Sequence, residues 1–217
     1  MTDQVRKLIA QASTQLNKGD TAEALISLLK AKVSFYDVGW RIEHLLGICY
    51  RLRGEFEESE AAFDRALKRL PKKDSLDRAR IVRDKSMLYL VQGDYATAEE
   101  QLEASRRLLS QHEKVPHEPN SRVEYFVTVG FVGRLRGQQG DILAARECFA
   151  AADAELRDRA PYELNNLVWW LSNETPSVRC KLGCRALRLA FAAKNRARVL
   201  QVIALTASPC LARRFGS

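Results

Sequence analysis

Four glycines, each followed by an acidic residue, divide most of this sequence into similar segments. The pairs are Gly19-Asp20, Gly54-Glu55, Gly93-Asp94 and Gly140-Asp141. Glycine permits the backbone conformation that ends a helix, and an acidic residue suits the first turn of the next helix, where N–H groups lack partners. Apolar residues recur at helical spacing on both sides of each pair, and no alternating strand pattern accompanies them. The pattern therefore predicts helix–turn–helix units and an all-α fold.

Downstream of each glycine, a small residue precedes a large apolar residue by four positions. These couples are Ala24 and Leu28, Ser59 and Phe63, Ala98 and Leu102, and Ala145 and Phe149. Small residues allow two helices to cross closely, and the large residue fills the groove between them. Each unit is therefore predicted to pack as a helix hairpin.

The second unit carries the most specific motif. Its motif residues are Leu46-Gly47, Tyr50, Ser59, Phe63, Ala66 and Pro71. They resemble the tetratricopeptide-repeat pattern, although Glu43 stands where the family usually has tryptophan and Ser59 where alanine is usual. The glycines lie 35, 39 and 47 residues apart (19 to 54, 54 to 93, 93 to 140), against about 34 in the family. The resemblance covers about residues 4–157 and implies a right-handed α-solenoid of about four such repeats.

The last part of the chain, residues 158–217, lacks the glycine pair and is predicted to be a separate basic helical extension of the repeat domain, residues 1–157. No acidic residue follows Glu174, whereas nine basic residues do, so the segment after Glu174 accounts for the positive formal charge of the chain. The candidate anion contacts here are Lys181, Arg185 and Arg188, which share one helix face. Two interpretations stay open, a terminal cap over the repeat core and a basic surface that contacts a partner.

The resemblance implies that the first helix of each repeat lines a concave ligand-binding groove. Counting back from each glycine places sixteen residues there, of which six are arginine and none is acidic. We therefore predict a groove that binds an acidic peptide or protein segment, since arginine pairs bidentately with carboxylates. The candidate ligand-binding residues are Arg6, Arg41, His44, Arg51, Arg80, Arg83, Met87 and Arg134. The alternative is that these arginines pair with carboxylates of neighbouring helices, such as Glu43, Asp84 or Glu124.

Motifs for catalysis, cofactors or metals are missing from the sequence. The three histidines show no ligand spacing, and neither a phosphate-binding glycine loop nor a nucleophile elbow is present. Five cysteines without a paired framework suit a reducing compartment. No apolar run is long enough to span a bilayer. These observations predict a cytoplasmic protein that is not an enzyme and has no cofactor or bound metal.

The leading functional prediction is a protein–protein interaction adaptor. The alternative is a nucleic-acid-associated regulator that uses the basic C-terminal segment, although no helix-turn-helix, zinc finger or aromatic stacking platform is recognisable. A membrane-surface anchor is less well supported, because the basic strip is narrow. A homodimer also stays open, since apolar helices at the end of a solenoid can associate.

Overall fold

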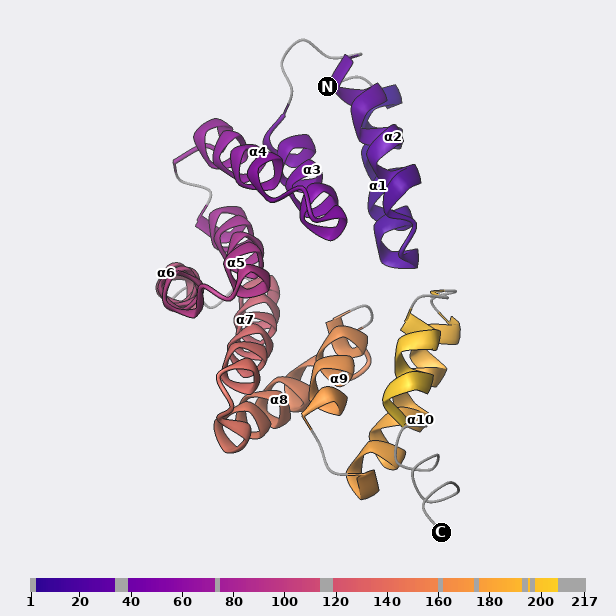
Figure 1. Ribbon diagram of the computed structural model, residues 1–217. Helices are drawn as coiled ribbons and strands as arrows, with labels where there is room; N and C mark the ends of the chain where they lie inside the picture. The colour runs from indigo at the N-terminus through magenta and orange to yellow at the C-terminus, as the bar shows by residue number, and fades with distance from the viewer. Residues whose placement is uncertain are drawn as a thin grey trace. The chain divides into compact units, whose positions relative to one another are not determined.

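The computed structural model describes residues 3–33, 39–72, 75–113, 119–159, 162–173, 176–192, 195 and 198–206 (Figure 1). These residues form the helices α1 (Asp3–Lys18), α2 (Thr21–Val33), α3 (Trp40–Arg53), α4 (Phe56–Arg69), α5 (Ser75–Gln92), α6 (Tyr95–Glu113), α7 (Pro119–Gln138), α8 (Ile142–Leu156), α9 (Tyr162–Ser172) and α10 (Pro176–Ala192). Residues 198–206 are also helical, and no strand occurs in the described part of the chain. The predicted all-α fold class is confirmed.

The chain forms two compact units, residues 1–125 and 126–217, and the boundary between them falls in the sequence of α7. The predicted boundary after residue 157, which follows the end of the repeat pattern, lies inside the second unit and stays a prediction. Among the described helices, none combines the length and the apolar character that crossing a bilayer requires.

The first unit consists of helix hairpins in sequence order. Helix α1 packs on α2, α3 on α4, and α5 on α6, while α2 also contacts α3 and α4 contacts α5. The first helices of successive hairpins are neighbours as well, because α1 contacts α3 and α3 contacts α5. We call the surface that α1, α3 and α5 share the first-helix face. The predicted helix–turn–helix units are confirmed.

The predicted glycine hinges have the left-handed backbone that ends a helix. Gly19, Gly54, Gly93 and Gly140 have φ angles of 86°, 80°, 80° and 85°. After two of them the acidic residue caps the next helix, because Asp94 accepts a hydrogen bond from the Thr97 N–H and Asp141 accepts one from the Ala144 N–H. Glu55 makes no side-chain cap, and its Oε1 instead accepts a hydrogen bond of 2.6 Å from Nε of Arg53 across the hinge.

The small and large residues of each hairpin form the core between its helices. All eight residues of the four predicted couples are buried, with exposures of 0–2%. In the second unit, α9 packs against α8 and α10. Its apolar residues Leu164, Leu167, Val168 and Leu171 form a buried cluster with Ala186 and Ala190 of α10 and with Val202.

Candidate interaction surface

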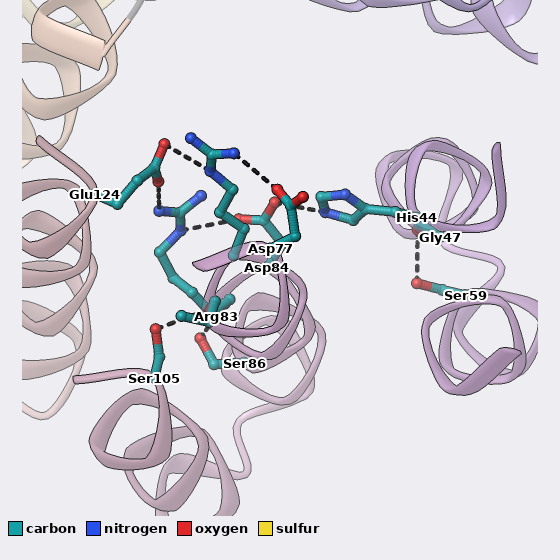
Figure 2. A network of polar contacts seen from close by, with 11 residues as sticks. His44, Gly47, Ser59, Asp77, Arg83, Asp84, Ser86, Ser105 and Glu124 are labelled. Atoms are coloured by element: carbon teal, nitrogen blue, oxygen red, sulfur yellow. Dashed lines mark hydrogen bonds and ion pairs between the residues drawn. The ribbon is translucent and has the colours of Figure 1, made fainter. Parts of the chain in front are cut away.

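Arg83 lies at the centre of a chain of ion pairs that joins α3, α5 and α7 within the first unit (Figure 2). Its Nη1 donates a hydrogen bond of 2.5 Å to Oε2 of Glu124, and its Nε donates one of 3.1 Å to Oδ1 of Asp84. Arg83 is 6% exposed and Glu124 is 2% exposed. The guanidinium therefore binds carboxylates of its own chain, away from solvent.

Further contacts extend this chain in both directions. Glu124 also pairs through Oε1 with Nε of Arg80, at 2.9 Å, and Arg80 Nη1 donates to Oδ1 of Asp77 at 2.8 Å. In the other direction, Nε2 of His44 lies 2.9 Å from Oδ2 of Asp84. Acidic and basic side chains thus alternate from His44 to Asp77. Arg83 and Arg80 each lie between two carboxylates, and Glu124 lies between two guanidinium groups.

The pKa values of Asp84, Arg83 and Arg80 are shifted in the direction that favours their charged forms. Burial acts to raise the pKa of Asp84, but the charge of Arg83 and the hydrogen bond with His44 outweigh it and hold that pKa well below its usual range. Burial acts to lower the pKa of Arg83, but Asp84 and Glu124 outweigh it and raise that pKa. The same balance, with Glu124 and Asp77 as partners, raises the pKa of Arg80. These charges stabilise one another.

The prediction that Arg83 and Met87 line an open groove is wrong, because Met87 is 2% exposed and Arg83 is buried in the network. For Arg80 and Arg83 the alternative of internal pairing is the correct one, and His44 likewise contacts Asp84. The physical reason is that counting from the glycine assigns a helix face but cannot show which neighbouring carboxylates occupy it. Asp84 follows Arg83 directly, and Glu124 comes from α7.

Two of the predicted arginines on the first-helix face are exposed. Arg41 lies in the first turn of α3 with its guanidinium carbon 5.1 Å from the centre of the Trp40 ring. The Arg6 side chain of α1 is 63% exposed, and its contact with Asp3 one turn away is long, at 3.4 Å. Arg51 is half-buried in the last turn of α3. Steps of three, four and three residues lead from Arg41 through His44 and Ile48 to Arg51. Arg41 and Arg51 therefore lie on the same stripe of α3.

In the second unit, the predicted Arg134 contacts an aromatic pair. Its guanidinium carbon lies 5.3 Å from the centre of the Trp169 ring. The Trp169 and Phe131 rings pack edge to face, with 4.8 Å between their centres. A cavity of about 20 Å³ lies beside this pair and is lined by Val127, Gly130, Phe131, Leu156, Tyr162, Asn165, Asn166 and Trp169. That volume holds about one water molecule. Arg134 thus lies against an aromatic ring of its own unit, a contact that sequence spacing did not predict.

The basic strip of α10 is narrower than predicted. Nε of Arg185 donates a hydrogen bond of 2.5 Å to Oε1 of Glu163, and its Nη1 donates one of 3.0 Å to Oδ2 of Asp153. Arg185 joins α8, α9 and α10 through these carboxylates, and its contact with an external anion stays a prediction. Arg188 is exposed, and the Lys181 side chain lies outside the described residues.

Glu43 is a buried carboxylate whose partners differ from the groove arginines that the sequence suggests for it. It is 0% exposed and forms ion pairs with three basic residues of α2 and α4. The sequence held one signal, namely the departure from the tryptophan that the repeat pattern usually has at this position. The described residues contain no group of three His, Cys, Asp or Glu side chains placed to hold a metal ion.

Comparisons with known proteins agree with this architecture. Residues 41–111 match the family model described as tetratricopeptide repeat. The structure is similar to one solved in a study titled "Functional Characterization of Pseudomonas Aeruginosa pilF", with 15% identity and a TM-score of 0.56 over 99% of this chain and 93% of the other. It is also similar to a putative kinesin light chain from Podosopora anserina with nearly identical TPR-like repeats, with 16% identity and a TM-score of 0.51 over 96% and 99% of the two chains. No curated protein sequence matches the chain.

The family match falls on the hairpins whose hinges, core couples and inter-repeat contacts are described above. Residues 41–111, which form the α3–α4 and α5–α6 hairpins, are therefore tetratricopeptide repeats. The chain as a whole has a fold similar to that of the two solved structures.

Proposed function

We propose that the protein is a non-enzymatic adaptor that binds an acidic segment of a partner protein on the first-helix face of its first unit. Arg41 is the observation that carries this proposal. It is exposed, and it belongs to the same stripe of α3 as His44 and Arg51. A guanidinium stacked on Trp40 has a restricted set of positions, so it loses less conformational freedom when it pairs with a carboxylate.

The proposed anion contacts are Arg6, Arg41 and Arg51, which is a smaller set than the sequence predicted. Arg6 is exposed on α1, and its contact with Asp3 is solvent-accessible on both sides. An exposed pair of this kind contributes about 0–1 kcal/mol and is readily exchanged for a partner's carboxylate. Ile9 and Ile48 pack partly against the core of the same unit, and their remaining surface supplies apolar contacts beside these arginines.

The internal networks support a binding role over a catalytic one. Asp84 and Glu124 are held by Arg83 and Arg80, so their lone pairs are already used in structural contacts. A general base needs a lone pair that can accept a proton from a substrate near neutral pH. The low pKa of Asp84 makes this carboxylate a weak base.

A capture experiment with charge-reversed variants tests the proposal. The immobilised protein is incubated with native lysate with and without nuclease, and bound proteins are eluted with rising salt. The variant Arg6→Glu with Arg41→Glu should lose the captured partner, and wild-type binding should weaken with salt because exposed charges are screened over about 8–10 Å at physiological ionic strength. The fold should survive, since exposed substitutions usually change stability by less than about 0.5 kcal/mol.

The matched control is Arg107→Glu with Arg188→Glu, which changes the net charge equally. Both residues are exposed, on α6 and α10. Arg185 would be an unsuitable control, because it is part of an internal ion pair. Retention of the partner by the control and its loss from the first-helix variant support the proposal. Loss from the control alone, with sensitivity to nuclease, would favour the nucleic-acid alternative.

A further inference from the structure

One side of helix α2 is apolar and exposed to solvent. Ala22, Ile26, Leu29 and Val33 are all exposed, the last three by 45%, 41% and 89%. Steps of four, three and four residues separate them, so they lie along one side of the helix. The residues with which α2 contributes to the core lie on the opposite side. We call the four exposed residues the apolar stripe.

The second helices of the next two hairpins have charged residues at the same positions. Counted from the hinge glycine, the equivalent residues are Glu57, Ala61, Asp64 and Lys68 on α4, and Ala96, Glu100, Glu103 and Arg107 on α6. All of these positions are exposed as well. Each of these helices thus has one alanine and three charged residues where the stripe of α2 has no charge. Because contiguous exposed apolar residues mark interaction sites, the difference indicates that α2 packs against another surface.

The apolar stripe is complementary to a second copy of itself that runs antiparallel. A two-fold axis between the positions of Ile26 and Leu29 places Ile26 of one copy beside Leu29 of the other. The same axis places the small Ala22 of one copy beside the larger Val33 of the other. Each contact then occurs twice, as the symmetry of a dimer requires, and small residues opposite large ones let two helices pack closely.

The charges of α2 favour the same antiparallel arrangement. Glu23 lies in the first turn of the helix, and Lys30 and Lys32 lie in its last turn. An antiparallel second copy brings the first turn of each helix beside the last turn of the other, so opposite charges meet, whereas a parallel copy would bring like charges together. Lys32 also pairs with Glu43 of its own chain, and Lys30 likewise has an interaction within its own chain. These lysines therefore orient the second copy through the sign of their charge.

We infer that the apolar stripe of α2 is an interaction surface for a second copy of this chain, which packs on it antiparallel. The surface belongs to a second helix and is separate from the first-helix face. The stripe spans about 17 Å, because eleven steps of 1.5 Å lead from residue 22 to residue 33. A contact of this length buries much less than the roughly 1,200–2,000 Å² of a stable complex. The dimer is therefore weak and depends on concentration.

Sedimentation velocity of the full chain tests this surface, over concentrations from about 5 to about 500 µM that suit a weak contact. The sedimentation coefficient of the wild-type protein should rise with concentration from that of a monomer towards that of a dimer. Ile26→Glu should weaken association about tenfold or more, because the dimer would bury one unpaired carboxylate from each copy. The position is exposed, so the fold should survive.

Ala61→Glu is the matched control, because it introduces the same charge at an exposed, outward position of α4. We expect it to change association by less than about twofold, since its charge lies outside the contact and is screened. A protein that stays monomeric throughout, or an equal effect of Ile26→Glu and Ala61→Glu, would overturn the inference. A dimer that both variants leave intact would do so as well, and would place association elsewhere, such as at the exposed Phe191, Leu200 and Ile203.

A charge reversal at Glu23 tests the antiparallel arrangement. Glu23→Lys should weaken association about threefold, because it brings like charges together at both ends of the contact. Glu58→Lys is its control, since Glu58 has the equivalent place in the first turn of α4 and is exposed, and it should leave association nearly unchanged. If Glu23→Lys strengthened association, or had no more effect than Glu58→Lys, the two copies would not pack antiparallel and the inference would be wrong.

Discussion

The hydroxyl of Ser59 donates a hydrogen bond of 2.7 Å to the backbone carbonyl of Gly47 across the α3–α4 hairpin (Figure 2). Both residues are buried, and a Cβ added to Gly47 would lie 2.8 Å from two ring carbons of Phe63. Such a contact is too close for van der Waals packing, so the crossing of α3 and α4 requires glycine at this position. Ser59 stands where the repeat usually has alanine, and its hydroxyl has a hydrogen-bond partner in the same Gly47 carbonyl.

Gly47→Leu should therefore destabilise the protein. The Phe63 ring that the new side chain meets is fully buried, so the helices must separate, which costs roughly 1–3 kcal/mol for an overpacked core. The measurement is the urea midpoint followed by circular dichroism. Ala61→Leu introduces the same side chain at an exposed position of α4 and should change stability by less than about 0.5 kcal/mol. Equal midpoints for Gly47→Leu and the wild type would contradict the close crossing.

The hairpins could be predicted from the sequence because their determinants are local. Gly54, for example, ends α3 through its own backbone conformation, and Ser59 and Phe63 are four residues apart on one helix face. The ion pairs could not be predicted in this way. Arg83 and Glu124 are 41 residues apart, and Arg185 binds Asp153 at a separation of 32. Only the packing of different helices shows which arginine meets which carboxylate.

Two free cysteines should differ in their reaction with iodoacetamide. Burial raises the pKa of Cys49 to about 12, and Arg53 opposes this only in part. The thiolate is the reactive form, so Cys49 should stay unmodified at pH 8, whereas the exposed Cys184 should react within minutes. Peptide mass spectrometry measures each site separately. Labelling of both cysteines in urea serves as the control, and equally fast labelling in the native protein would contradict the burial of Cys49.

The contribution of Asp84 to stability should disappear in acid. Its pKa in the folded state lies below the value in the unfolded chain, which is about 3.9. Below about pH 4 the unfolded state therefore binds more protons than the folded state, and stability falls as the pH falls. We expect the difference in unfolding free energy between the wild type and Asp84→Asn to be constant from pH 7 to 5 and to shrink below pH 4. A difference that stays unchanged down to pH 3 would contradict a paired, ionised Asp84.

Removal of Arg83 should be among the more damaging single changes in the first unit. Arg83→Met leaves Asp84 and Glu124 in buried positions without the guanidinium between them, and breaking a buried pair in this way costs about 3–5 kcal/mol. The double variant Arg83→Met with Glu124→Met removes the stranded carboxylate on α7 as well. It should be less destabilised than the sum of the two single variants, by about 0.5–3 kcal/mol.

The exposed pair of Arg6 and Asp3 provides the comparison for the double-mutant cycle of Arg83 and Glu124. The two side chains are 63% and 88% exposed, so water screens their attraction and solvates either one when the other is removed. The cycle of Arg6→Met and Asp3→Asn should therefore give a coupling of less than about 1 kcal/mol, and close to zero at high salt. The coupling of Arg83 with Glu124 should persist in the same salt, because the pair is buried. If both couplings were equally small, Arg83 would not hold α5 and α7 together, and the interpretation of Arg83 as an internal structural residue would be wrong.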